Sequence, residues 1–185
     1  MFLSNDDYQI EIIKDNQYTL FSSDNKFYDD VIQMADYTRN DYICVYCVCI
    51  YSDMGEHKIA LIGRGFGSIE NSAVLKDNVL VILIDDYLVF FNLISKRLEK
   101  KIKIIDFGTG IELYSFEDGF IVNVETEIIN VDKFGNKIWS FSGRDIWVTE
   151  NGGSSINILG DTILLKNFEG QTYLLDRFGK EITNT

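Results

Sequence analysis

Three cysteines stand within six residues, at Cys44, Cys47 and Cys49, and are the first candidates for metal or redox chemistry. Side chains of a β-strand point alternately to its two faces, so Cys47 and Cys49 share one face and Cys44 lies on the other. A structural zinc site needs about four ligands, and the only histidine, His57, lies in the following turn. Buried, reduced cysteines behave as small hydrophobic residues. We therefore expect core packing here, with no metal site and no disulfide framework.

No combination of residues indicates catalysis. His57 occupies a position that carries Arg97, Lys137 and Glu181 in the other copies of a repeat described below. That variety predicts an exposed surface position rather than a general base. No serine lies between glycines at the spacing of a nucleophile elbow. We therefore expect that the protein is not an enzyme, has no catalytic residue and uses no cofactor.

Acidic residues recur in one kind of hairpin turn. Asp85 and Asp86, then Glu125 and Glu127, and then Glu169 fall in equivalent turns of successive repeats. This would place carboxylates on one edge of the molecule, where they could hold a cation or meet a basic protein. Solvated turns are the simpler interpretation, because acidic residues are common in turns. The dense oxygen-ligand spacing of a calcium loop is not found.

Trp147 lies among polar neighbours that include Arg144. Large aromatic side chains in such surroundings can anchor protein interfaces, although core packing is the favoured alternative. We expect Trp147 on the first strand of the fourth repeat. The candidate binding residues are Trp147, Arg144, Asp85, Asp86, Glu125 and Glu127.

One type of hairpin turn occurs four times along the chain, and the candidate residues described above can be placed relative to it. Its first position holds residue types that favour turns, namely Ser52, Asn92, Asp132 and Asp176. Its fourth position holds Gly55, Ser95, Gly135 and Gly179. Glycine there supplies a positive φ, so Ser95 predicts strain or a different turn type in the second copy. The runs before each turn are apolar, β-branched or aromatic, as in strands.

A second hairpin precedes each copy, so each repeat of about 40 residues supplies three or four strands of an up-and-down meander. In the first repeat, residues 31–35 are expected to form a hairpin with 42–51. The central strands are apolar on both faces, which suits sheets covered on both sides.

The predicted fold is all-β, with four antiparallel meanders arranged like the blades of a β-propeller. A small closed four-bladed ring and an open or half propeller both fit. A single domain covers residues 1–185, with repeats at approximately 31–62, 73–105, 113–141 and 156–185. Residues 1–30 form either an N-terminal hairpin that extends the first repeat or a clasp strand that completes the last one.

The segment Val131–Phe141 resembles the repeat of PQQ-like, and more broadly WD40-like, β-propellers. That repeat runs from a strand ending in Asp132 through the turn at Gly135 to a strand that bears Trp139, and the fourth repeat matches it in part. The resemblance implies a propeller fold and blade-to-blade packing of Trp139. It brings no cofactor-binding residue to this chain.

The net charge of −12 and the pI near 4.4 limit the possible partners. Nucleic acids and anionic membranes bind clustered Lys and Arg, so neither is expected here. A basic protein partner is compatible with the charge, and solubility alone also explains it. The N-terminus lacks a signal-peptide pattern and the apolar runs are too short to span a bilayer as a helix, so a cytoplasmic location is expected.

The sequence therefore favours a non-catalytic protein-binding module, and a more specific form is a bacterial immunity-type or regulatory interaction protein. The alternative is a small-ligand-binding protein or enzyme with its site in the central channel. Polar residues that face inward on the first strand of each repeat would favour this alternative. A monomer and a homodimer that pairs through open blade faces both remain open.

Overall fold

The apolar runs of the chain pair into sheets that follow one another along the sequence, and the strands within a sheet are antiparallel except for one parallel pair in the first sheet. The structure, a computed structural model, describes residues 1–66, 69–105 and 108–182. The end of the fourth predicted repeat, 183–185, lies outside the described residues. Within the described residues, no helix is long and apolar enough to cross a membrane.

Four sheets make up the part of the chain that the structure describes. The first contains β1 (Phe2–Ser4), β2 (Gln9–Lys14), β3 (Asp30–Gln33), β4 (Cys44–Ser52) and β5 (Gly55–Gly63). The second contains β6 (Ala73–Lys76), β7 (Val79–Ile84), β8 (Tyr87–Asn92) and β9 (Arg97–Lys103). The third contains β10 (Gly110–Phe116), β11 (Gly119–Val124), β12 (Glu127–Val131) and β13 (Lys137–Phe141). The fourth contains β14 (Ile156–Leu159), β15 (Thr162–Lys166) and β16 (Thr172–Leu175).

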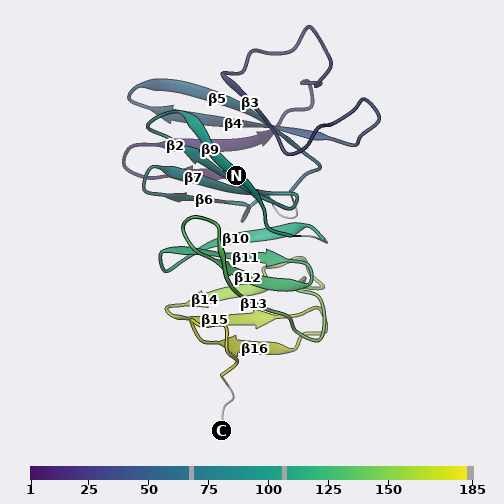
Figure 1. The fold of residues 1–185 in the computed structure, drawn as a ribbon, viewed down its shortest axis with the longest axis vertical. Coiled ribbons are helices and arrows are strands. Elements are labelled where there is room, and N and C mark those ends of the chain that lie inside the picture. Colours follow the sequence, from purple (N-terminus) through teal and green to yellow (C-terminus); the bar gives the residue numbers. More distant parts are fainter. Residues whose placement is uncertain (67–68, 106–107, 183–185) are drawn as a thin grey trace.

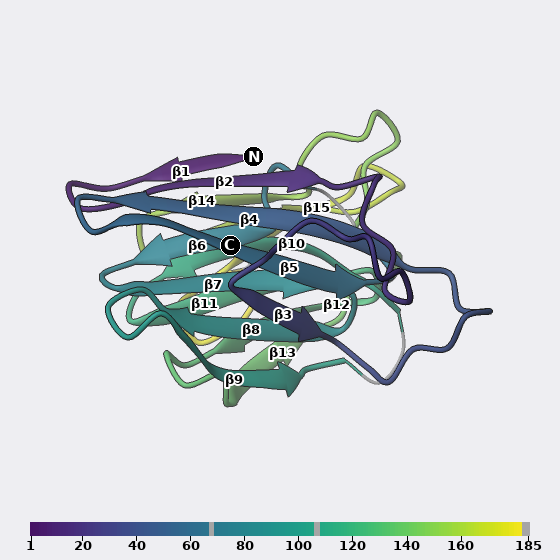
Figure 2. The ribbon, with the colours of Figure 1, turned by 90° about the horizontal axis from the view of Figure 1, so that it is seen from above.

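The sheets are stacked face to face, with one hydrophobic core between each sheet and the next. The first core joins Val48 of β4 to Leu80 of β7. The second joins Phe90 of β8 to Phe120 of β11, and the third includes Ile163 of β15. The first and last sheets lie at opposite ends of the stack (Figure 1), and the sheets overlap when viewed from above (Figure 2). The arrangement is thus an open stack, and the central strands are covered on both faces as predicted.

The first sheet departs from the predicted hairpin between residues 31–35 and 42–51. A strand has only two edges, and those of β4 are taken by β2 and β5, with Ile12 opposite Val48 and Val48 opposite Ile59. β3 instead pairs in parallel with the outer edge of β5. The predicted hairpin is therefore wrong, and β1 and β2 extend the first sheet rather than reaching the last one.

The repeated turn has the backbone that its glycines indicate. Gly55, Gly135 and Gly179 have φ values of 100°, 79° and 74°. In the third copy, Oδ1 of Asp132 accepts hydrogen bonds from the backbone N–H groups of Phe134 and Asn136. The second copy has a different turn, because the positive φ of 53° falls on Lys96 rather than on position 95. The expectation raised by Ser95 is confirmed.

The fourth of these turns also holds two neighbouring sheets together. An added Cβ at Gly179 would lie 2.6 Å from Cδ2 of Trp139 on β13, so the turn of the fourth sheet packs directly on the indole. The indole Nε1–H donates to the carbonyl oxygen of Arg177 in the same turn, at 3.0 Å. Trp139 therefore links the third and fourth sheets, as the propeller resemblance implies.

We expect Gly179→Ala to destabilise the fold by about 1–3 kcal/mol, because alanine both overpacks the Trp139 contact and resists a positive φ. Gly160→Ala is the matched control, since Gly160 has a similar φ of 66° but open space around it. Urea unfolding followed by circular dichroism measures both changes. If the two variants lose the same stability, the contact with Trp139 contributes nothing beyond the backbone effect.

Candidate functional site

The two ends of the stack differ in what lies on their outer faces. The outer face of the first sheet is covered by the loops on either side of β3, residues 15–29 and 35–43, here called the covering segment. Its packed side chains are Tyr18, Leu20, Tyr28, Tyr37 and Ile43. They lie on outward-facing side chains of β4 and β5, namely Val45, Cys47, Cys49, Ala60 and Ile62. The Tyr28 hydroxyl donates to Oδ2 of Asp15 at 2.6 Å and so ties the segment together.

The outer face of the fourth sheet carries aliphatic side chains among polar ones, and no other described segment packs over it. Because side chains alternate along a strand, Ile163 and Leu175 point into the third core while Leu164 and Leu174 point outward. Leu164 and Leu174 are register partners on adjacent strands. We call the outward residues Leu159, Leu164, Leu174 and Ile182 the terminal face.

The side chains of the terminal face are more exposed to solvent than the side chains of the hydrophobic cores. Leu159 is 49% exposed and Ile182 is 39% exposed, while Leu164 and Leu174 are half-buried. The backbone N–H of Ile182 donates to the carbonyl oxygen of Leu174, which holds residue 182 beside β16. None of the four core clusters found among the described residues includes a terminal-face side chain. These four aliphatic side chains, on a face that also carries Asn157, Thr162, Lys166 and Thr172, therefore give the terminal face an apolar part that can contact another apolar surface.

The first of the acidic hairpin turns, in contrast, makes hydrogen bonds to other segments of the same chain. Asp85 is buried, and its carboxylate accepts the backbone N–H groups of Arg64 and Gly65 at 2.8 and 2.9 Å. The Tyr37 hydroxyl lies 3.3 Å from the same carboxylate. Burial raises the pKa of Asp85 above its ordinary value, although these hydrogen bonds oppose the shift. Burial, together with the Asp85 carboxylate, raises the pKa of Tyr37 to about 12.

The remaining predicted binding residues differ in their burial and in their partners. Asp86 pairs with Lys103 at 3.2 Å, and Glu127 pairs with Lys137 at 3.1 Å. Glu125 and Arg144 are exposed. Trp147 lies in the loop before β14 rather than on a strand, and it is fully buried. Because Asp85 and Trp147 are buried, the six residues do not form one exposed surface, and Trp147 packs in the third core.

A cavity of about 490 Å³ opens between the first and second sheets beside Asp85. Arg64, Asp86 and Lys103 also line it. Because Asp85 is held by backbone donors and Asp86 is paired with Lys103, the charges of this cavity are largely balanced within the chain.

A buried polar cluster, which the sequence did not single out, joins three sheets. Oε1 of Glu112 on β10 accepts hydrogen bonds from Asn71 and Tyr114, at 3.2 and 2.9 Å. Its Oε2 accepts from Asn123 and Ser154, at 3.1 and 3.3 Å. Glu112 is only 4% exposed. Four donor groups thus lie within hydrogen-bond distance of the carboxylate, about as many as an ionised carboxylate accepts. The single proton of the Ser154 hydroxyl is shared with the carbonyl oxygen of Ile156, which lies closer, at 2.9 Å.

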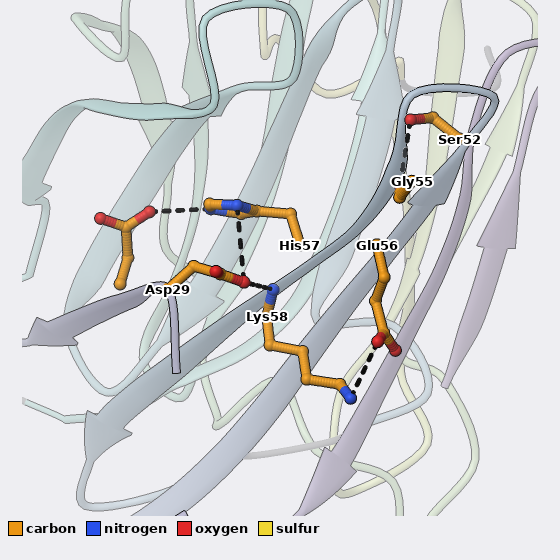
Figure 3. Close-up of polar contacts among 7 residues, drawn as sticks. Asp29, Ser52, Gly55, Glu56, His57 and Lys58 are labelled. Atoms are coloured by element: carbon orange, nitrogen blue, oxygen red, sulfur yellow. Dashed lines mark hydrogen bonds and ion pairs between the residues drawn. The ribbon is translucent and has the colours of Figure 1, made fainter. Parts of the chain in front are cut away.

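His57 is not the exposed side chain that the repeat predicts. Its side chain is 12% exposed, and Nε2 lies 2.8 Å from Oδ2 of Asp30. Nδ1 lies 3.7 Å from Oδ2 of Asp29, which also accepts the backbone N–H of Lys58 (Figure 3). The prediction is wrong because β3 crosses beside β5 and brings Asp29 and Asp30 over the imidazole. His57 on β5 therefore helps to hold the edge strand β3 in place beside β5.

Comparison with known proteins supports the fold. No protein-family model and no curated protein matches this sequence. Among solved structures, the computationally designed Ika8 protein matches with a TM-score of 0.53 and 10% identity, over 79% of this chain and 46% of that chain. The dihydro-heme d1 dehydrogenase NirN matches with a TM-score of 0.52 and 14% identity, over 80% of this chain and 35% of that chain.

BamB from Moraxella catarrhalis is also similar, with a TM-score of 0.49 and 12% identity, over 80% of this chain and 46% of that chain. The chain spans less than half the length of each of these three proteins. At such low identity the likeness shows the fold alone. Together with the four stacked antiparallel sheets, it shows that the chain is an all-β protein with a propeller-like fold.

Proposed function

We propose that this chain is a protein-binding module that docks through the terminal face, and that the occupant of this face is a second copy of the chain. The observation that carries the proposal is the contrast between the two ends of the stack. The outer face of the first sheet lies under the covering segment, whereas Leu164 and Leu174 are paired on the outer face of the fourth sheet, over which no other described segment packs. Burying apolar surface is the main favourable contribution to most protein association.

The charge distribution favours a second copy over a basic partner. Residues 156–182 contain four acidic and three basic residues, whereas the first 72 residues contain twelve acidic and five basic ones. Two copies can therefore approach through their fourth sheets with little repulsion, despite the net charge of −12. A strongly basic partner would find little attraction there. The rim carboxylates Asp86 and Glu127 are already paired with lysines of the chain.

The geometry favours a twofold contact between like faces. The covering segment keeps the first sheet of one copy from stacking on the fourth sheet of another. A twofold axis instead brings the same patch of both copies together, as in most dimers. Sheets that pack face to face lie about 10 Å apart, with interdigitated side chains. Leu164 and Leu174 would then contact their counterparts.

Light scattering coupled to size exclusion tests the proposal. We expect the native chain to run at twice its 21.3 kDa mass, and Leu174→Lys to run as a folded monomer because a charge on an apolar face opposes pairing. Ser140→Lys, an exposed position on β13, is the matched control and should remain a dimer. High salt should leave the dimer intact, since an apolar contact is not screened.

Three results would contradict the proposal. They are a native chain that stays monomeric at every concentration, a Leu174→Lys dimer, and a dimer that high salt dissociates. The last would favour a charge-based contact and so the basic-partner hypothesis. Circular dichroism of each variant separates the loss of pairing from the loss of folding.

The alternative of a ligand site in the central channel has less support. A ligand site in the channel would be supported by polar, inward-facing residues on the first strand of each repeat, and Glu112 on β10 is such a residue. However, its four hydrogen-bond donors all come from the chain. We further propose that the module has no catalytic activity of its own, because the imidazole of His57 is held between Asp29 and Asp30.

A further inference from the structure

Two thiols meet on the outer face of the first sheet. The Sγ atoms of Cys47 and Cys49 lie 3.0 Å apart. Both residues face a cavity of about 490 Å³ that is also lined by Glu11, Tyr28 and Lys58. Glu11 and Lys58 are the register neighbours of Cys49 on the two adjacent strands. The pair therefore forms the floor of a groove beneath the covering segment.

The backbone geometry opposes a direct disulfide between these residues. Alternate Cα atoms of an extended strand lie about 6.6–6.8 Å apart, at the far limit of the range in which disulfides form. The two Cβ atoms also project in parallel from the sheet rather than toward each other. An ion inserted between the sulfurs avoids this problem. Metal–sulfur bonds of about 2.3 Å bridge two sulfurs roughly 3.2–3.8 Å apart, which a small side-chain rotation provides.

The available ligands limit the kind of ion. Among the described residues, no group of three or more His, Cys, Asp and Glu side chains could hold a metal, so a four-ligand zinc site is not formed here. Soft ions prefer thiolate ligands and tolerate low coordination numbers. We propose that Cys47 and Cys49 form a dithiol chelating site for a soft, thiophilic metal or metalloid ion, of which trivalent arsenic is the representative.

Binding at this site requires the thiols to lose their protons. Burial raises the pKa of Cys47 to about 12, so the free thiol reacts slowly with simple alkylating agents at neutral pH. A trivalent arsenical overcomes this because its oxygen leaves as water. Phenylarsine oxide, C6H5As=O, reacts with two thiols to give two As–S bonds and one water molecule, and neither arsenic nor sulfur changes oxidation state.

Phenylarsine oxide added to the reduced, full-length chain provides the test, followed by native mass spectrometry. We expect one arsenical per chain, which a monothiol does not remove and a dithiol does. Cys47→Ser and Cys49→Ser should each weaken binding at least tenfold, because only one sulfur remains. Cys44→Ser is the matched control and should bind as the native chain does, since Cys44 packs in the first core on the other face of β4.

Mapping of the thiols in the native chain gives a second measurement that needs no variant. After unfolding, Cys47 and Cys49 of the adduct should resist maleimide while Cys44 reacts. The proposal is overturned if no stable adduct forms, if Cys44 is among the protected thiols, or if both single serine variants, folded by circular dichroism, bind as tightly as the native chain. None of these outcomes bears on dimer formation, which involves the opposite end of the stack.

Discussion

Replacing Trp147 by alanine is expected to destabilise the fold by about 3–5 kcal/mol, the usual cost of removing a large aromatic side chain from a core. Trp147 has no exposed surface, and its ring lies 5.8 Å from that of Phe141 and 5.5 Å from that of Tyr173. Its backbone N–H donates to the carbonyl oxygen of Glu125 at 2.8 Å. One residue of a loop therefore links the third and fourth sheets, and alanine would leave a cavity between them.

Thermal unfolding followed by circular dichroism measures this effect, and we expect the midpoint to fall by about 6–20 °C for a chain of this size. Trp147→Phe should lose much less, because the indole Nε1 has no hydrogen-bond acceptor among the described residues. Phe178→Ala is the exposed control, since Phe178 is 68% exposed in the fourth sheet's turn. A Trp147→Ala variant as stable as Phe178→Ala would show that the loop does not contribute to the third core.

Replacing Glu112 by alanine is expected to cost a similar amount, about 3–5 kcal/mol, because it leaves buried polar partners unpaired. Asn71 precedes the second sheet, Asn123 lies in the third and Ser154 precedes the fourth, and all three donate to this carboxylate. Glu112→Gln is the more informative variant. Its amide NH₂ would face two donors, so we expect a loss of about 1–3 kcal/mol although the shape is unchanged.

Urea unfolding of Glu112→Ala, Glu112→Gln and the exposed control Glu125→Gln separates charge from packing. Glu125 is exposed in the adjacent hairpin, so its neutralisation should leave the midpoint unchanged. If Glu112→Gln behaves like Glu125→Gln, the side chain accepts fewer hydrogen bonds than the geometry indicates. If Glu112→Ala were more stable than the native chain, the free-energy cost of burying the carboxylate would exceed the stabilisation from its hydrogen bonds.

Local features of the sequence predicted the architecture well. Turn residues such as Asp132 and Gly135 act within their own hairpins, and apolar runs such as β11 are buried along their whole length. A hairpin depends on residues close in the chain, so turn chemistry and strand composition are enough to locate it. The substitution at Ser95 even indicated which of the four turns would differ.

Contacts between distant segments could not be predicted in the same way. β3 pairs with β5 rather than with β4, and this pairing brings Asp30 to His57. Nothing local in residues 29–33 indicates a parallel partner. β3 pairs with β5 because both edges of β4 are occupied, one by β2 and the other by β5. The same limit explains why Asp85, a typical turn residue, proved to be buried against Arg64 and Gly65 of the preceding loop.

The candidate site was missed for a different reason. The sequence predicts that strands apolar on both faces are covered on both sides, which holds for the central sheets and does not hold for Leu164 and Leu174 at the end of the stack. Period-two alternation cannot tell a covered face from an open one, because both are apolar. Glu112 did carry a signal, namely a charged residue between apolar neighbours on β10, but its partners come from three separate parts of the chain.

The covering segment determines at which end of the stack unfolding is expected to begin. In a stack, each sheet is stabilised only by its immediate neighbours, so opening can spread from either end. Here one end is closed by Tyr18, Tyr28 and Ile43, whereas the other ends in a three-stranded sheet with an open face. Local unfolding should therefore begin at β14–β16 and leave the first two sheets folded. Pairing of two copies through the terminal face would close this weak end and make the whole chain unfold as a single cooperative unit.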